Sequence, residues 1–151
     1  MEEAMFDANQ ELKRVDHLIY VSLKYTRTAD VLKNVIERLL SAYDNMVLVV
    51  LRAAKESGNL EEVSNAPIKR YEQVLECYPD DVEMKELAEF TQYLRKLSKL
   101  EYGSESEYRR HVAMIFNLEG ETVKVDIDKV TEYYKKAKEI FQNIKSKIEN
   151  D

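Results

Sequence analysis

The stretch ADVLKNVIERLLSAYDNMVLVVLRAAK, residues 29–55, decides the fold. Its apolar residues return every three or four positions, which predicts an amphipathic helix ending near Lys55. From Met46 to Leu51 this helix is apolar on every side, and such a helix is usually central, with partners on both sides. The valines there also suit a strand, but the helical spacing that flanks them favours a helix. The main apolar stripe consists of Val31, Val35, Leu39, Ala42, Met46, Val49 and Ala53.

The same periodicity predicts further helices on either side of this one. A junction at residues 26–28 is expected to separate the first two helices, with one continuous helix bent there as the open alternative. Residues 59–66 and 101–107 are typical of loops. The further helices are expected over residues 5–26, 67–78, 81–100 and 128–149. Their expected start signals are Thr28, Pro67, the pair Asp80 and Glu83, and Asp128.

The period changes in RRHVAMIFNLEGETVKVDI, residues 109–127, where apolar and polar residues alternate on both sides of Glu119 and Gly120. Alternation around such a turn predicts a β-hairpin over about residues 110–127. Because an isolated hairpin is marginal in water, its apolar face must pack on the helices or pair with another chain. The expected fold is mainly α: a four- or five-helix bundle with this hairpin before the C-terminal helix, in a single domain over residues 1–151.

Composition excludes several kinds of chemistry. The chain has a net charge of −6, and the acidic excess lies between Lys55 and Glu89, with 10 acidic and 4 basic residues. Its 3 glycines cannot form the glycine-rich phosphate loops, and two histidines with one cysteine do not fit a zinc site. Neither a metal nor a cofactor is expected. No signal peptide and no apolar run of about 20 residues is present, which favours a cytoplasmic protein without a membrane partner.

Two groups of polar and aromatic residues are candidates for binding. The first follows i, i+3, i+7 and i+10 and is expected to line one helical ridge, while the second opens the hairpin, where basic residues can bind phosphate. Each also has a structural interpretation, as a solvated helix face or as charge that protects an edge strand. The first group is His17, Tyr20, Lys24 and Arg27, and the second is Arg109, Arg110 and His111.

Three glutamates at i, i+3 and i+6, namely Glu83, Glu86 and Glu89, raise the question of a magnesium site. All-α nucleotide pyrophosphatases bind Mg²⁺ with E-x-x-E on one helix and E-x-x-D on another. The chain has the first motif and lacks the second downstream of it. A solvated acidic face is therefore favoured, and an Mg²⁺-dependent nucleotide hydrolase is the least favoured function.

Long antiparallel helices, abundant tyrosine and a lysine-rich last helix resemble the small HEPN-like helical proteins of archaea and bacteria. The run YVSLKYTRT, residues 20–28, resembles an uncharacterised archaeal family. Many HEPN proteins are ribonucleases or partners of minimal nucleotidyltransferases, and their nuclease motif is Arg, four to six residues, then His. Here Arg14 precedes His17 by three positions and Arg110 adjoins His111, so the resemblance does not imply nuclease activity.

Taken together, these patterns favour a non-enzymatic interaction protein. A homodimer is expected, because the apolar turns at 46–51 and the marginal hairpin both require cover, and an obligate interface buries such surface. The first alternative is an RNA-associated, HEPN-like protein that binds nucleic acid through the two basic-aromatic groups. A protein partner other than a second copy also remains open.

Overall fold

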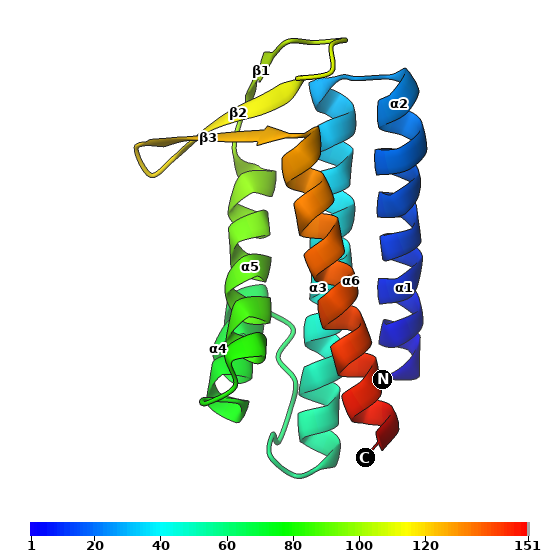
Figure 1. Ribbon diagram of the computed structural model, residues 1–151. Helices are drawn as coiled ribbons and strands as arrows, with labels where there is room; N and C mark the ends of the chain where they lie inside the picture. Colours follow the sequence, from blue (N-terminus) through cyan, green and yellow to red (C-terminus); the bar gives the residue numbers. More distant parts are fainter. Residues whose placement is uncertain (151) are drawn as a thin grey trace.

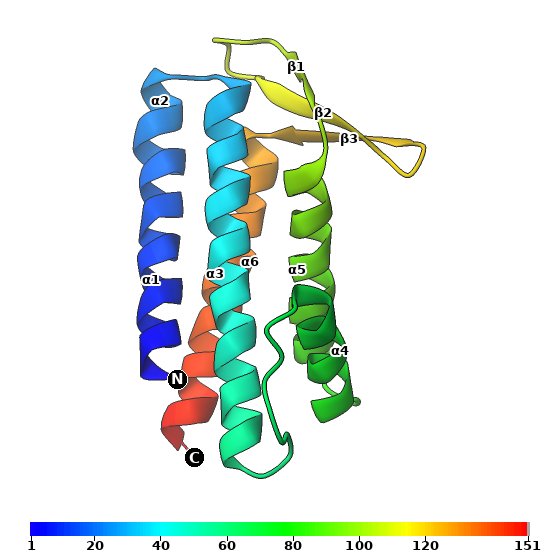
Figure 2. The same cartoon turned by 180° about the vertical axis from the view of Figure 1, so that it is seen from behind.

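Helix α3 (Ala29–Glu56) is the central helix of the protein, as the sequence predicts. The computed structural model describes residues 1–150. In it α3 contacts α1 (Glu2–His17), α4 (Pro67–Cys77), α5 (Val82–Lys99) and α6 (Ile127–Asn150). The axes of the long helices are roughly aligned, with α1 and α3 antiparallel, and the strands cross one end of the bundle (Figure 1). The opposite view shows α3 between α1 and α5 (Figure 2).

The all-apolar turns of α3 are enclosed within the chain itself. Met46, Val49 and Leu51 are fully buried, and Val47 and Val50 are nearly so. Burying each such side chain contributes about 1.5–3 kcal/mol, so these two turns supply a large part of the stability. No second chain is needed to cover them.

The first helix and α3 are separate helices. α1 continues through a π-helical segment, η1 (Leu18–Ser22), into a last turn, α2 (Leu23–Tyr25). Thr28 is extended (φ −118°, ψ 154°), and its hydroxyl accepts a hydrogen bond from the Val31 N–H at 3.3 Å. Thr28 is therefore the N-cap that the sequence predicts, and the alternative of one bent helix is wrong. The π-helical segment was not predicted, because its wider turns leave no simple periodic pattern over five residues.

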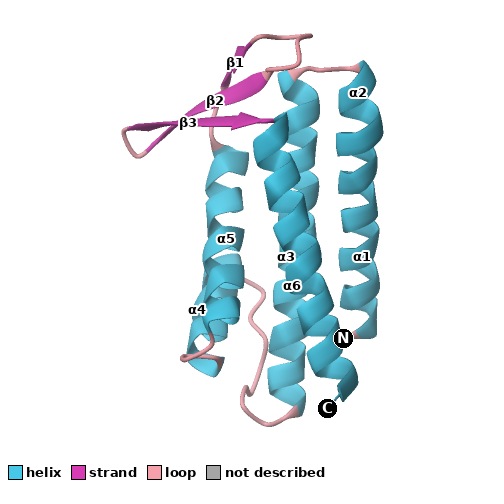
Figure 3. Cartoon of the chain, in the orientation of Figure 1, coloured by secondary structure: helices cyan, strands magenta, loops and turns pink. Residues whose placement is uncertain are grey.

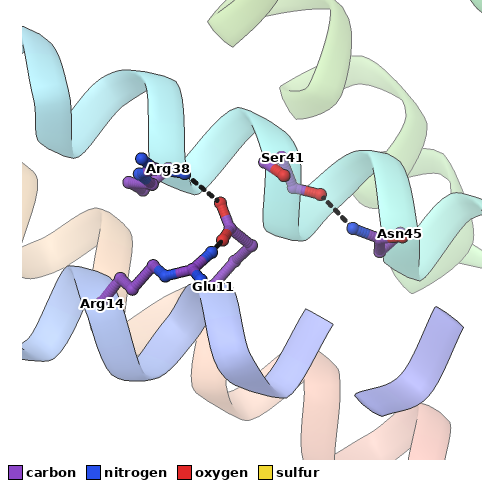
Figure 4. A network of polar contacts seen from close by, with 5 residues as sticks. All are labelled: Glu11, Arg14, Arg38, Ser41 and Asn45. Carbon is purple, nitrogen blue, oxygen red and sulfur yellow. Dashed lines mark hydrogen bonds and ion pairs between the residues drawn. The ribbon is translucent and has the colours of Figure 1, made fainter. Parts of the chain in front are cut away.

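A buried carboxylate joins α1 to α3. Glu11 is only 5% exposed, and it accepts from Arg14 on its own helix and from Arg38 of α3 at 3.3 Å (Figure 4). A carboxylate so enclosed is costly without such partners. On α3 itself, Asn45 donates to the Ser41 carbonyl at 3.0 Å. Both arginines of this network therefore have structural roles.

Helices α4 and α5 pair with each other and with α3. Pro67 occupies the first position of α4, as predicted. The predicted capping box of Asp80 and Glu83 is wrong by one residue. Asp81 is the N-cap of α5, since its extended backbone lets its carboxylate accept from the Met84 N–H at 3.1 Å.

The predicted hairpin is confirmed as strands β2 (Ala113–Leu118) and β3 (Glu121–Asp126). Glu119 and Gly120 connect them with positive φ values of 54° and 88°, the conformation that a two-residue type I′ turn requires. The apolar cross-strand pairs are Met114 with Val125 and Phe116 with Val123.

A third strand, β1 (Gly103–Glu105), pairs antiparallel with β2, where the sequence predicted only a loop over residues 101–107. Its residues are small or charged and all exposed, so they carry no alternating apolar signal. The sheet order is β1-β2-β3 (Figure 3). β2 packs on α3, and its Met114 and Phe116 are buried in the common core. The hairpin is therefore not isolated.

Strand β3 passes directly into α6. The Asp126 carboxylate accepts from the Lys129 N–H at 2.8 Å, so Asp126 fills the capping role that the sequence assigned to Asp128. That assignment is wrong because the helix begins one residue earlier, at Ile127. The side of α6 that faces the core carries Val130, Tyr134, Ala137, Phe141 and Ile144, which are buried. Within residues 1–150, no helix is both long and apolar enough to cross a membrane.

Candidate binding cleft at the helix junction

The turn between β1 and β2 is fastened to the junction between α2 and α3. The Glu107 carboxylate accepts from the Ala29 N–H, with N–O distances of 3.2 and 3.4 Å, at the N-terminus of α3. The Tyr108 N–H donates to the Arg27 carbonyl at 2.7 Å. Ser106 and Tyr108 have positive φ values, 56° and 65°, which non-glycine residues adopt only where surrounding contacts hold them. These bonds fix the 106–111 turn beside the end of the first helix.

The docking of this turn creates a cleft of about 420 Å³ between segments far apart in the sequence. Both predicted groups contribute to it. Ile19 and Leu23 contribute buried apolar side chains, while Asp126, Ile127 and Asp128 come from the start of α6. The predicted residues that line this basic-aromatic cleft are Tyr20, Lys24 and Arg27 from the first group, and Arg110 and His111 from the second.

The basic side chains of the cleft are not neutralised by ion pairs. Within the described chain, Lys24, Arg27 and Arg110 form no ion pair; the Lys24 ammonium lies 6.0 Å from the centroid of the Tyr25 ring. Four arginines elsewhere are engaged, Arg14 and Arg38 with Glu11, Arg95 with Asp44, and Arg70 with the Ser64 carbonyl, whereas Arg52 and Arg109 form no ion pair within the described residues. Three of the cleft's side chains thus keep their charge available for an external anion.

Two carboxylates limit this positive field. Asp126 is committed to the cap of α6, and Asp128 is exposed in the first turn of that helix. The sequence did not predict that either carboxylate borders the site. Their position depends on how the hairpin packs on the helices, which places the start of α6 near Arg27. The cleft therefore combines three cations and a histidine with two carboxylates, which suits a moderately anionic ligand better than a dense polyanion.

His17 does not join the other members of its predicted ridge. It lines a different hollow, with Lys13, Arg14 and Arg38. The reason is the π-helical segment that follows it. Each residue of an α-helix turns by about 100°, so the wider turns of that segment shift the register between His17 and Tyr20.

The sequence predicted the second group, Arg109, Arg110 and His111, on a strand of the hairpin, and this is wrong. Residues 109–111 lie in the turn before β2, and the Arg109 N–H donates to the Ser106 carbonyl at 3.0 Å. Because these residues form a turn, Arg110 and His111 line the cleft while the neighbouring Arg109 lies exposed outside it.

Exposed aromatic rings occur on the two segments that form the cleft, and Tyr20 lines the cleft itself. Tyr20 is 49% exposed, Tyr25 79% and Tyr108 77%. Tyr25 follows the π-helical segment and faces solvent. The Tyr20 ring meets Tyr134 edge-on at 6.3 Å, and the Tyr134 hydroxyl donates to Asp16 at 2.8 Å, which links the helix to α6.

The three glutamates of α5, Glu83, Glu86 and Glu89, are not arranged as the ligands of a metal ion. Glu83 accepts from Asn143 at 2.6 Å, and Glu86 pairs with Lys136 at 3.3 Å. Across residues 1–150, no group of three His, Cys, Asp or Glu side chains is placed to hold a metal ion.

Comparison of the chain with known protein families, with curated proteins and with solved structures found no match. The resemblance to HEPN-like proteins accordingly stays a prediction. Function has to be inferred from the arrangement of this chain's own residues.

Proposed function

We propose that this chain is a non-enzymatic interaction protein that binds an acidic segment of a partner protein in the basic-aromatic cleft. The observation that supports this most is the convergence of Arg27 and Arg110, which are 83 positions apart, with no ion-pair partner for either within the described chain. Guanidinium groups bind carboxylates through two parallel hydrogen bonds, which gives both strength and orientation.

The surroundings of these arginines favour a protein partner. Tyrosine and arginine are enriched among the residues that dominate binding energy at interfaces, and Tyr20 supplies such a ring in the cleft. Asp126 and Asp128 on its border, together with the chain's net charge of −6, repel a continuous polyanion more than a peptide with spaced carboxylates.

The test is titration of the ¹⁵N-labelled protein with a Glu-rich peptide that contains one phenylalanine. Amide signals of residues 24–28 and 110–112 are expected to shift. Replacing both cleft arginines, Arg27→Gln with Arg110→Gln, is expected to weaken binding about tenfold. The matched control is Arg52→Gln, an arginine of α3 that is equally without an ion-pair partner but outside the cleft. Equal losses in the two variants, or no shifts at the cleft, would contradict the proposal.

Single-stranded RNA is the second candidate, and the exposed rings of Tyr25 and Tyr108, which adjoin Lys24 and Arg109 in the sequence, favour it. Bases stack on such rings while arginine contacts the phosphates. An oligouridylate is then expected to be retained at low salt and released as salt rises. Absence of retention at low salt would remove this candidate. If the oligouridylate shifts the cleft signals and the peptide does not, RNA replaces the acidic segment as the partner.

Self-association remains a further proposal. The enclosed apolar turns and the three-stranded sheet no longer require cover by a second copy, so its support is weaker than the sequence suggested. A mass near twice 17.8 kDa by light scattering would support a dimer, and a mass of one chain would exclude it. We also propose a cytoplasmic location, with which one cysteine and no possible internal disulfide agree.

A further inference from the structure

A second hollow, of about 410 Å³, lies where α5 and α6 both pack on α3. Glu86, Glu89, Phe90 and Tyr93 share one face of α5, at successive intervals of one or three residues. Tyr133, Lys136 and Ile140 lie along one face of α6, and Tyr43 comes from α3. Figure 1 shows α6 in front of α3, with α5 beside them. We call this hollow the aromatic pocket.

Aromatic rings form a continuous wall in the pocket. The Phe90 ring lies 5.2 Å from Tyr43, 5.7 Å from Tyr93 and 5.0 Å from Tyr133, measured between centroids. Ring faces carry partial negative charge and attract cations, most strongly where water is excluded. Four rings around one hollow are therefore suited to a positively charged group with an apolar body.

The charges at the rim point to the same kind of ligand. Lys136 is the cation among the lining residues, and its ammonium is shared between Glu86 at 3.3 Å and Glu139 at 3.9 Å. Glu89 has neither an ion pair nor a hydrogen bond within the described residues. The rim thus retains negative charge that the protein itself does not neutralise.

A buried hydroxyl in the wall has no partner. Tyr43 is 0% exposed, and its oxygen forms no hydrogen bond to any part of the described chain. An unsatisfied buried polar group costs about 1–3 kcal/mol, so natural structures rarely keep one. Burial, and then the nearby charge of Glu86, raises the pKa of Tyr43 well above its ordinary value. The wall of the pocket therefore contains a neutral hydroxyl that lacks a hydrogen-bond partner.

We propose that the aromatic pocket binds a small organic ammonium ion with an apolar body. The ammonium lies against the rings and near the carboxylate of Glu89, the apolar body contacts Ile140, and an N–H of the ligand donates to the Tyr43 hydroxyl. This site is separate from the basic-aromatic cleft, and its chemistry is the opposite: the cleft attracts anions, and the pocket attracts cations.

The test compares phenethylammonium with 2-phenylethanol, a neutral molecule of the same shape. Binding is followed by tyrosine fluorescence, since the chain contains no tryptophan, and by calorimetry. The ammonium is expected to bind at least about tenfold more tightly than the alcohol. Equal binding of the two, or no ammonium binding at millimolar concentration, would overturn the proposal.

Variants locate the site. Glu89→Gln removes the unpaired charge and Phe90→Leu removes a ring while keeping an apolar side chain, and each is expected to weaken binding of the ammonium about five- to tenfold. The control, Glu72→Gln, removes an exposed acid of α4 outside the pocket and is expected to change nothing. If Phe90→Leu fails to fold, the surface variant Glu89→Gln decides the question. Unchanged binding in Glu89→Gln would overturn the proposal.

Discussion

The basic-aromatic cleft and the aromatic pocket have nearly the same volume, about 420 and 410 Å³, and are built in opposite ways. The cleft is formed mainly by exposed or half-buried charged side chains at a junction, a turn and the start of α6. The pocket is formed by rings that project from the middle of three core helices. The difference teaches that the cleft can change its chemistry without disturbing the core, whereas in the pocket ligand binding and stability depend on the same side chains.

The sharpest way to break this comparison is to truncate one wall residue of each hollow. Tyr43→Ala is expected to lower the free energy of unfolding by about 3–5 kcal/mol, because it leaves a large void in the core. Arg27→Ala, at the surface, is expected to change it by no more than about 0.5 kcal/mol. Urea unfolding followed by circular dichroism measures both. Similar losses for the two variants would show that the cleft is as integral to the fold as the pocket.

Alkaline pH probes the pocket in another way. Burial raises the pKa of Tyr43, and burial with a hydrogen bond to Tyr93 raises that of Tyr133, above the value near 10 of an unfolded tyrosine. Because the pKa of each tyrosine is higher in the folded than in the unfolded protein, its contribution to the free energy of unfolding is fully present below about pH 10. This contribution is lost as the pH rises above that value. At about pH 11 the loss from Tyr43 is about 1 kcal/mol.

The measurement is the free energy of urea unfolding at pH 8 and at about pH 11. The free energy of unfolding is expected to fall less between the two pH values in Tyr43→Phe than in wild type, because phenylalanine does not ionise. An identical loss in wild type and Tyr43→Phe would mean that Tyr43 already ionises normally in the folded protein.

The sequence predicted the helices and the hairpin because these features depend on local periodicity. The stripe around Met46, the cap at Thr28 and the turn at Glu119 and Gly120 are all visible within a few residues. The features it missed depend on distant segments. Strand β1 has no apolar signal and exists because β2 lies beside it, and Asp81 outcompetes Asp80 as a cap only through its backbone conformation.

The two sites show the same limit. Residues of the cleft were identified by type, since tyrosine, histidine, lysine and arginine gather in two short stretches of the sequence, but their convergence required the turn that Glu107 fastens to Ala29. The register shift that separates His17 from Tyr20 arises from the π-helical segment, which the sequence did not show. The aromatic pocket was missed altogether, because Tyr43 and Tyr133 have the spacing of ordinary core residues and only the packing of three helices leaves a hollow among them.

The fastening of the cleft is open to a direct test. Glu107→Ala removes the carboxylate that accepts from the Ala29 N–H. This carboxylate also interacts favourably with the positive end of the α3 dipole. The free energy of unfolding is expected to fall by about 1 kcal/mol. Hydrogen exchange of the Tyr108 amide, which donates to Arg27, is expected to accelerate more than that of Val125 in the buried part of β3. Equal acceleration at the two amides would show that the turn does not open independently of the core.

The smallest expected effect distinguishes a packing role from a binding role in the pocket. Tyr43→Phe removes only the unpartnered hydroxyl, so the protein is expected to become about 0.5–1 kcal/mol more stable at neutral pH. The same variant is expected to bind phenethylammonium less tightly, because the oxygen that accepts its N–H is gone. Increased stability with weaker binding would mean that the hydroxyl serves the ligand at the expense of the fold. Lower stability at neutral pH would instead show that this oxygen has a partner in solution, such as a bound water, and that the pocket is closed to a ligand at this point.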